Sequence, residues 1–208
     1  MKNAKCKLCR REGIKLFLKG ERCYSTKCAL VKRKYPPGVH GPKGYLKLTE
    51  YGQQLREKQK LKRNYNISER QLKNYFNKAK RKIGNTEIDL MKMLEMRLDS
   101  VVFNVGFATS RLTVRQMINH GHILVNGRKV TIPSYQVKVG DVISLKQNSK
   151  LKKNVEESLI FCAERRKMHL DWLAFDEKKL EIKVVSQPEV DNLLKEFNIK
   201  LVVEFYSR

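Results

Sequence analysis

The spacing of apolar residues across residues 97–145 predicts a small unit that opens with two helices. Four apolar residues recur at helical intervals before Gly106, where a helix would end; they are Leu98, Val101, Val102 and Val105. Thr109 or Ser110 can cap a second helix, which would end at Gly121 and bury the face formed by Val114, Met117 and Ile118. We therefore expect a helix pair at the start of this unit.

The pattern then changes to that of strands. Residues 123–125 and 128–130 flank Asn126 and Gly127, a pair typical of a type I′ hairpin turn because both positions need a positive φ. Gly140 and Asp141 mark another turn before a strand at residues 142–145. Two helices followed by a hairpin and short strands make a small α/β module.

The flanking regions show other patterns. Residues 51–82 are predicted to be helical, with Ser68 and Gln71 as a capping box, and residues 89–95 continue as a helix into the module. Beyond the module, residues 172–175 and 182–185 read as strands around a turn at Asp176 and Glu177. The tail from residue 189 to 205 is amphipathic, and we expect it to pack against the helical segment through Val190, Leu193, Leu194 and Phe197.

The first 50 residues are less regular. Residues 11–23 contain a short strand-like run with a turn at Gly20. Residues 35–42 are too rich in Pro and Gly for regular structure and are predicted to be an ordered connector. Cys162 shares a helical face with Val155 and Leu159 and is expected to be a small buried residue rather than a nucleophile. The predicted class is α+β.

The charge of the chain indicates what kind of partner it binds. The 208 residues include 45 Lys+Arg against 21 Asp+Glu, a net charge of +24. Residues 1–153 carry 36 of the basic and only 10 of the acidic residues. Such a chain pairs with a polyanion, either nucleic acid or an anionic membrane. No apolar run approaches the roughly 18 residues of a membrane span, and no apolar signal region opens the chain, so we expect a cytoplasmic protein.

Four cysteines in the first 30 residues have metal-ligand spacing. They follow the pattern C-x2-C-x13-C-x4-C, in which two close pairs of thiols are joined by a short loop, and they are Cys6, Cys9, Cys23 and Cys28. We expect a structural Zn²⁺ site, and an iron–sulfur cluster on the same thiols is the alternative. The other interpretations are two disulfides or free thiols. Disulfides are disfavoured because we expect the protein in a reducing compartment.

The module carries polar and basic residues that can contact phosphates and groove edges. The helix pair and hairpin are predicted to bring them near one edge; they are Arg97, Arg111, Arg115, Asn119, His120, His122, Arg128 and Lys129. A DNA-type helix-turn-helix or a solvated basic face would be the alternatives. The hairpin that directly follows the second helix argues against both.

Three regions resemble one family, that of small-subunit ribosomal protein four. The module matches it through SR-x3-RQ-M-x3-GH-x-LVNG and PSY-x-V-x3-D-V, the arm through CKLCRREGIKLFLKGERC and YPPG-x-HG, and the helical segment through EYG-x-QLREKQKLKR and ERQ-x3-NYF-x2-A. The resemblance implies that the helical segment grips small-subunit ribosomal RNA. Carried over by position, the contacts would be Tyr51, Gln54, Arg56, Lys58, Lys60, Arg63, Arg70 and Lys80. The tyrosines and Phe76 are expected in the core more often than on RNA bases.

The resemblance also implies a place in the small subunit. Members bind early to a junction in the 5′ domain of the RNA, line the channel through which messenger RNA enters beside other small-subunit proteins, influence decoding accuracy and often repress their own messenger. Lys43 and Lys47 are the residues we would place at that channel. Expected partners are therefore small-subunit ribosomal RNA, messenger RNA and neighbouring ribosomal proteins, with no membrane and no small-molecule substrate.

Three parts are expected along the chain. Residues 1–44 form the four-cysteine arm and connector, residues 45–92 form a basic helical domain completed by residues 187–208, and residues 93–186 form the module with its extension. No triad, phosphate-cradling glycines or paired buried carboxylates are visible, so we expect no enzyme. A stand-alone RNA chaperone or rescue factor is the main alternative. An RNA-modifying enzyme would need a further catalytic domain. A transcription factor would need a dimer interface with a heptad pattern, and none is visible.

Overall fold

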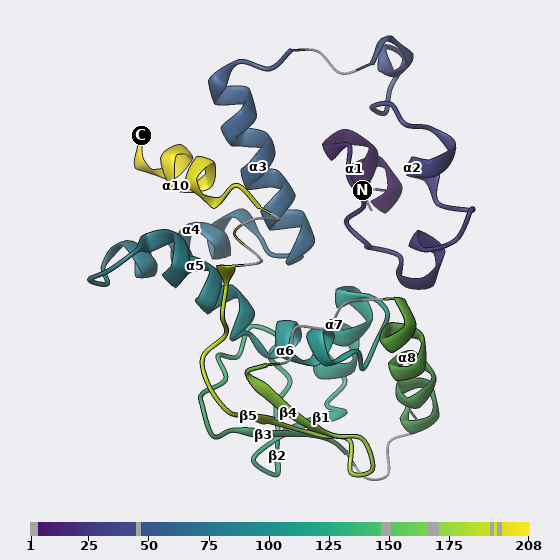
Figure 1. Cartoon of the computed structure of the whole chain (residues 1–208), viewed down its shortest axis with the longest axis vertical. Helices are drawn as coiled ribbons and strands as arrows, with labels where there is room; N and C mark the ends of the chain where they lie inside the picture. The colour runs from purple at the N-terminus through teal and green to yellow at the C-terminus, as the bar shows by residue number, and fades with distance from the viewer. Residues whose placement is uncertain (1–3, 45–46, 147–150, 166–170, 192–193, 195–196) are drawn as a thin grey trace. The chain divides into compact units, whose positions relative to one another are not determined.

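The computed structural model describes residues 4–44, 47–146, 151–165, 171–191, 194 and 197–208. Its internal contacts divide the chain into two compact units, Met1–Glu87 with Leu193–Arg208 and Ile88–Asn192. Figure 1 shows the helices of both units and the antiparallel sheet of the second. The elements confirm the predicted α+β class.

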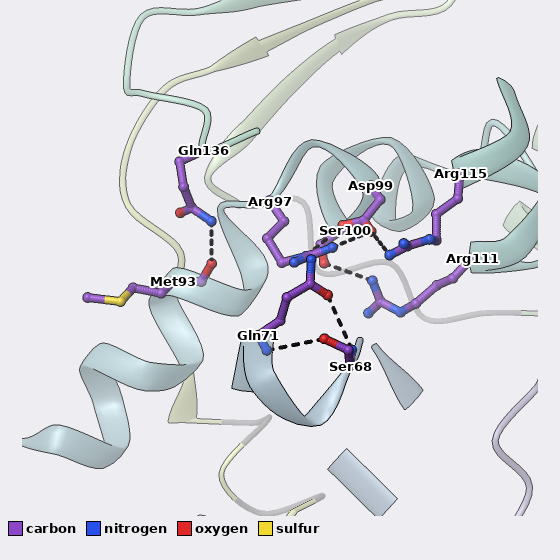
Figure 2. A network of polar contacts seen from close by, with 9 residues as sticks. All are labelled: Ser68, Gln71, Met93, Arg97, Asp99, Ser100, Arg111, Arg115 and Gln136. Carbon is purple, nitrogen blue, oxygen red and sulfur yellow. Dashed lines mark hydrogen bonds and ion pairs between the residues drawn. The ribbon is translucent and has the colours of Figure 1, made fainter. Parts of the chain in front are cut away.

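The first unit is helical where the sequence predicted helices. Its main elements are α3 (Glu50–Asn64), α4 (Glu69–Lys80) and α10 (Ile199–Ser207). Ser68 and Gln71 form the predicted capping box at the start of α4, and Figure 2 shows both of its hydrogen bonds. Helix α10 packs against α3 and α4, so the tail does return to the helical segment.

The amphipathic tail is helical only in part. Residues 186–190 are not helical, Asp191 and Leu194 are, and α10 begins after Asn198, whose side chain accepts a hydrogen bond from the Leu201 amide. Val190 and Phe197 of the predicted face are buried and Leu194 is half-buried, whereas Leu193 lies outside the described residues. The aromatic pairing of Phe76 with Tyr206, at 5.1 Å between ring centroids, ties α4 to α10.

The amino-terminal arm consists of short helical turns. These are α1 (Lys5–Glu12), η1 (Gly20–Cys23), α2 (Ala29–Lys32) and η2 (Gly41–Lys43). The strand-like run predicted within residues 11–23 is wrong, since no strand forms there. Phe17 takes φ 48°, which interrupts an extended backbone, and the Leu16 and Leu18 side chains fold onto Cys9 instead of pairing in a sheet.

The connector is ordered by one arginine of the arm. The guanidinium of Arg10 donates to the carbonyl oxygens of Tyr35 and Pro36, at 2.9 and 3.0 Å, and lies over the Tyr35 ring at 4.8 Å. Gly41 leaves the room this fold needs, since a Cβ there would lie 2.0 Å from the Pro36 carbonyl oxygen.

The second unit places helices on a five-stranded sheet. The helices are α5 (Thr86–Glu95), α6 (Leu98–Val105), α7 (Arg111–Asn119) and α8 (Lys152–Arg165). The strands β1 (Ile123–Val125), β2 (Arg128–Lys129), β3 (Val142–Leu145), β4 (Leu173–Asp176) and β5 (Glu181–Val184) run antiparallel in the order β2-β1-β3-β5-β4.

Local chemistry explains why these elements form where they do. Helix α6 ends at Gly106 in the left-handed region with φ 100°, and Ser110 caps α7 by accepting from the Thr113 amide. Asn126 and Gly127 both have positive φ, 49° and 75°, as a type I′ turn requires. Strand β2 is one residue shorter than predicted, whereas β3 has the predicted bounds.

Alternate residues of the central strands point into the core of this unit. Ile123, Ile143 and Ile182 have no exposed surface and pack with the inner faces of α6 and α7. Cys162 of α8 is buried, as predicted. Among the described residues, none of the helices has both the length and the apolar character that crossing a bilayer would require.

Candidate nucleic-acid interface

A buried carboxylate organises the predicted basic edge of the second unit. Asp99, in the first turn of α6, accepts hydrogen bonds from Arg97 Nε and Nη2 at 2.9 and 2.7 Å and from Arg115 Nη1 at 2.9 Å (Figure 2). The side chains of Arg97 and Asp99 are 0% and 2% exposed, whereas that of Arg115 is 24% exposed. One carboxylate therefore holds two guanidinium groups from different elements.

This geometry corrects the expected surface position of Arg97. The side chain is interior because residues 133–137 run across the start of α6: the Leu98 and Asp99 amides donate to the Tyr135 and Pro133 carbonyls, and Gln136 donates to the Met93 carbonyl (Figure 2). A fully buried guanidinium needs an anionic partner, which Asp99 supplies. As placed, Arg97 supports the module and offers no surface to RNA.

Arg111 is also mostly interior. Its Nη1 donates to the Ser100 hydroxyl at 2.9 Å (Figure 2), its Nη2 lies 3.9 Å from a Glu95 oxygen, and its guanidinium lies 4.5 Å from the centre of the Phe103 ring. The side chain is only 10% exposed. Arg111 thereby links the start of α7 to α6 and to the last residue of α5.

The exposed part of the basic edge lies at the end of α7 and on the β1–β2 hairpin. Asn119, His120, Arg128 and Lys129 are exposed and His122 is half-buried. Asn126 anchors the hairpin tip, since its amide group donates to Asp141 and accepts from the Val142 backbone amide, both at 2.9 Å. The structure brings these residues together and holds their backbone in place, so they can donate to phosphates.

Charge in the first unit is paired more fully than the sequence suggested. Lys58 is buried, donates to Glu69 at 2.7 Å and lies 4.3 Å from the centre of the Phe205 ring. Lys62 and the Tyr206 hydroxyl also donate to Glu69, at 3.0 and 2.7 Å. Burial would raise the pKa of Glu69, but the hydrogen bonds from Lys58, Tyr206 and Lys62 outweigh it and lower that pKa to about 2. Burial and the Glu69 carboxylate raise the pKa of Tyr206.

A second carboxylate, Glu12 of α1, joins the arm to α3. It is 2% exposed and pairs with Arg63 and with Arg56, the latter at 3.2 Å. Burial raises the pKa of Glu12 and lowers that of Arg63, and the opposite charges of the two groups counteract both shifts. Two of the predicted RNA contacts therefore hold the arm in place.

The other predicted residues of this unit divide by exposure. Gln54 is buried and donates to Glu50 and Glu204, and Lys60 pairs with Glu57. Tyr51 is 51% exposed, with the Arg208 guanidinium 5.9 Å from its ring centre. The predicted residues that are exposed cations are Arg70, Lys80, Lys43 and Lys47.

The four cysteines of the arm line one pocket, together with Leu18 and the basic residues Lys5, Lys19 and Arg22. Burial raises the pKa of the Cys9 and Cys23 thiols, and the neighbouring cysteines raise both further. Within the described part of the chain, no group of three or more His, Cys, Asp or Glu residues is placed so that it could hold a metal ion. Four thiols are nevertheless a donor set that suits zinc or an iron–sulfur cluster, and all four cysteines line the same pocket.

Sequence reasoning missed the carboxylates that organise these groups. Glu12, Glu69 and Asp99 each pair with two cations. Only part of this charge pairing can be recognised in the sequence. The separation of two residues between Arg97 and Asp99 at a helix start is visible in the sequence, but Glu12 lies 44 and 51 residues from its partners. The scarcity of acids in residues 1–153 indicated that the basic side chains pair with a polyanion, whereas Glu12, Glu69 and Asp99 are each shared between two of them.

Comparison with known proteins agrees with this architecture. The description "Ribosomal protein S4/S9 N-terminal domain" matches residues 1–95, and "S4 domain" matches residues 96–143. Small ribosomal subunit protein uS4 of Halothermothrix orenii is 51% identical over 98% of this chain and 96% of its own. The uS4 protein of Thermus thermophilus is 48% identical over the same shares, and uS4A of Clostridium novyi is 49% identical over 99% and 97%. The chain therefore belongs to the uS4 family of small ribosomal subunit proteins.

Proposed function

We propose that this protein is a structural constituent of the small ribosomal subunit and binds small-subunit ribosomal RNA directly. Family membership over nearly the whole chain supports the ribosomal role and argues against an enzyme. The observation that carries the RNA-binding surface is the cluster of exposed polar and basic groups at the end of α7 and on the β1–β2 hairpin. In a chain of net charge +24, such groups bind phosphates largely by counterion release.

The sheet offers a matched pair of sites to test this surface. Arg128 and Lys129 are exposed on the β1–β2 hairpin, and Lys178 and Lys179 are exposed between β4 and β5, at the opposite edge of the same sheet. The double alanine variants at the two sites remove the same charge. We expect only Arg128→Ala/Lys129→Ala to weaken binding to a 5′-domain ribosomal RNA fragment and to lower the salt slope by about two, roughly one per lost phosphate contact.

Equal losses at the two edges would contradict a localised interface. They would show that net charge alone determines the affinity. Unchanged binding in both variants would remove the hairpin from the RNA-binding surface.

The finer roles follow from the family resemblance and are proposed on that basis. Early binding would nucleate assembly of the 5′ domain, and the exposed cations Lys43 and Lys47 would face the channel through which messenger RNA enters and so influence accuracy. Reduced cross-linking of messenger RNA to small subunits that carry Lys43→Glu/Lys47→Glu would support the second role. Unchanged cross-linking would contradict it.

The cysteine pocket is proposed to hold Zn²⁺ through Cys6, Cys9, Cys23 and Cys28, with an iron–sulfur cluster as the alternative. Two observations support a structural metal: all four cysteines line one pocket, and the apolar cluster of the arm has only Cys9, Leu16 and Leu18 as buried members among the described residues, with Leu8 and Ile14 partly buried against them. So small a core contributes little folding free energy, and a bound metal would supply it. Elemental analysis of the purified protein distinguishes the two, since a cluster brings iron, sulfide and visible absorption.

A stand-alone RNA chaperone or rescue factor is the second candidate. The S4 domain match at residues 96–143 is compatible with it, but such a factor would not need the region matched at residues 1–95. Recovery of the protein with assembled small subunits favours the ribosomal role, and recovery with free RNA alone would favour the alternative.

A further inference from the structure

The turn that closes α7 holds two imidazole rings in a fixed frame. The Gly121 amide donates to the Ile118 carbonyl at 2.8 Å and the His122 amide to the Met117 carbonyl at 3.1 Å. With Gly121 at φ 73°, this is the hydrogen-bond pattern of a Schellman motif. The His122 carbonyl also accepts from the Lys146 amide at 2.9 Å, so the backbone on both sides of Gly121 is tied down.

The rings of His120 and His122 lie parallel on either side of this glycine. Their planes differ by 13° and their centroids are 6.3 Å apart. The two rings therefore present nearly parallel faces at one backbone turn. His120 is exposed and His122 is half-buried, so a planar group can reach the rings from solvent.

A cation is held at the same turn. A Cβ on Gly121 would lie 2.0 Å from Cε and 2.9 Å from Nζ of Lys129, so the lysine stem crosses the glycine and its ammonium lies beside the turn. Lys129 reaches this place from β2, where it is paired with Leu124 of β1. The partial negative charge at the carboxyl end of a helix favours an ammonium there.

We propose that this turn is a site for one unpaired nucleotide of the bound RNA, whose base stacks on His120 and His122 and whose phosphate pairs with Lys129. The proposal rests on the RNA-binding function proposed above and assigns this turn a ligand subsite. A paired base hides its faces inside a helix, whereas a base in a loop or bulge can stack on a side-chain ring. A ring pair and an ammonium on one fixed backbone turn match the two chemistries of a nucleotide.

Two substitutions at the exposed ring separate stacking from charge. His120→Ala removes one stacking face, and His120→Phe keeps a flat ring without ring nitrogens. In binding of the full chain to the 5′-domain ribosomal RNA fragment, we expect His120→Ala to lower affinity about tenfold, within the range of one lost base–aromatic stack. His120→Phe is expected to stay near the unsubstituted protein, and neither variant should change the salt slope. Lys129→Ala should lower both the affinity and the slope, the latter by about one.

Base-specific chemical probing of the same RNA locates the site. The expected result is one unpaired nucleotide that is protected by the unsubstituted protein and by His120→Phe but reactive with His120→Ala. Equal protection and affinity in all three proteins would overturn the proposal, as would equal loss in both variants, which would indicate a polar contact instead of stacking. Failure of the unsubstituted protein to bind the fragment would instead refute the proposed function, and unchanged thermal unfolding of the variants controls for folding.

Discussion

Asp99→Asn is the substitution whose effect follows most directly from the structure. It keeps the shape of the side chain but removes the charge that three guanidinium hydrogen bonds depend on, at 2.7 to 2.9 Å. The amide nitrogen of the new asparagine would also place a hydrogen-bond donor against the N–H donors of the two guanidinium groups. Because Arg97 has no exposed surface, its buried charge would lose the anion that Asp99 supplies. Breaking a buried pair in this way costs about 3–5 kcal/mol, a large share of the 5–15 kcal/mol by which domains are stable.

The chain contains one tryptophan, which makes the measurement specific to the second unit. Trp172 is 5% exposed and belongs to the core of that unit, so its fluorescence in a urea titration reports the unfolding of this core. Two variants calibrate the result. Arg115→Ala removes the partner that is 24% exposed and should cost less, about 1–2 kcal/mol. Glu177→Gln alters an exposed carboxylate and should stay within about 0.5 kcal/mol.

The reasoning fails if Asp99→Asn lowers the free energy of unfolding by less than Arg115→Ala does. That order would mean that Arg97 does not depend on Asp99 in the folded protein. A loss confined to RNA affinity, with unchanged unfolding, would equally contradict the structural role assigned here to Asp99 and return Arg97 to the RNA-binding surface.

Three further predictions concern both units. The pKa of Glu69 is lowered from 4.5 to about 2, so its ion pairs stabilise the protein fully above pH 4.5 and are lost as pH falls toward 2. The difference in melting temperature between the unsubstituted protein and Glu69→Gln should therefore shrink over that range. A constant difference would contradict this prediction. Cys23→Ser, or a chelator, should speed proteolysis of the amino-terminal arm, and an arm that stays resistant under both treatments would refute the structural metal. Gly121→Ala and Gly127→Ala both place alanine at a positive φ and should each lower the free energy of unfolding by about 1–2 kcal/mol. Only the Cβ at position 121 would clash with Lys129, so only Gly121→Ala should also weaken RNA binding. Equal RNA affinities of the two variants would show that the position of the lysine is immaterial.

Elements determined by local chemistry were predictable from the sequence. The glycine at position 106, the serine cap at 110 and the Asn-Gly pair at 126–127 each require a particular backbone conformation, and the structure has it. The capping box at residues 68 and 71 is equally local. The strand predicted within residues 11–23 was wrong because the apolar side chains of that segment pack into a small core around Cys9, and no local pattern distinguishes such a segment from a strand.

Pairing between charges was the least predictable part of the candidate site. Composition showed that basic residues greatly outnumber acids, and it predicted that residues 1–153 bind the polyanion. It could not show that Lys58 and Arg63 turn inward, because their partners come from other elements. The exposed groups at the end of α7 and on the following hairpin, by contrast, lie on one continuous stretch, and their grouping could be inferred from sequence alone.

The central claim is direct and selective binding of small-subunit ribosomal RNA. The most direct test titrates the purified protein against the 5′-domain fragment across a salt series, with transfer RNA and duplex DNA as competitors. We predict tight binding that survives both competitors and has a steep salt dependence. Equal affinity for all three nucleic acids would contradict the claim and leave a non-specific basic RNA-binding protein.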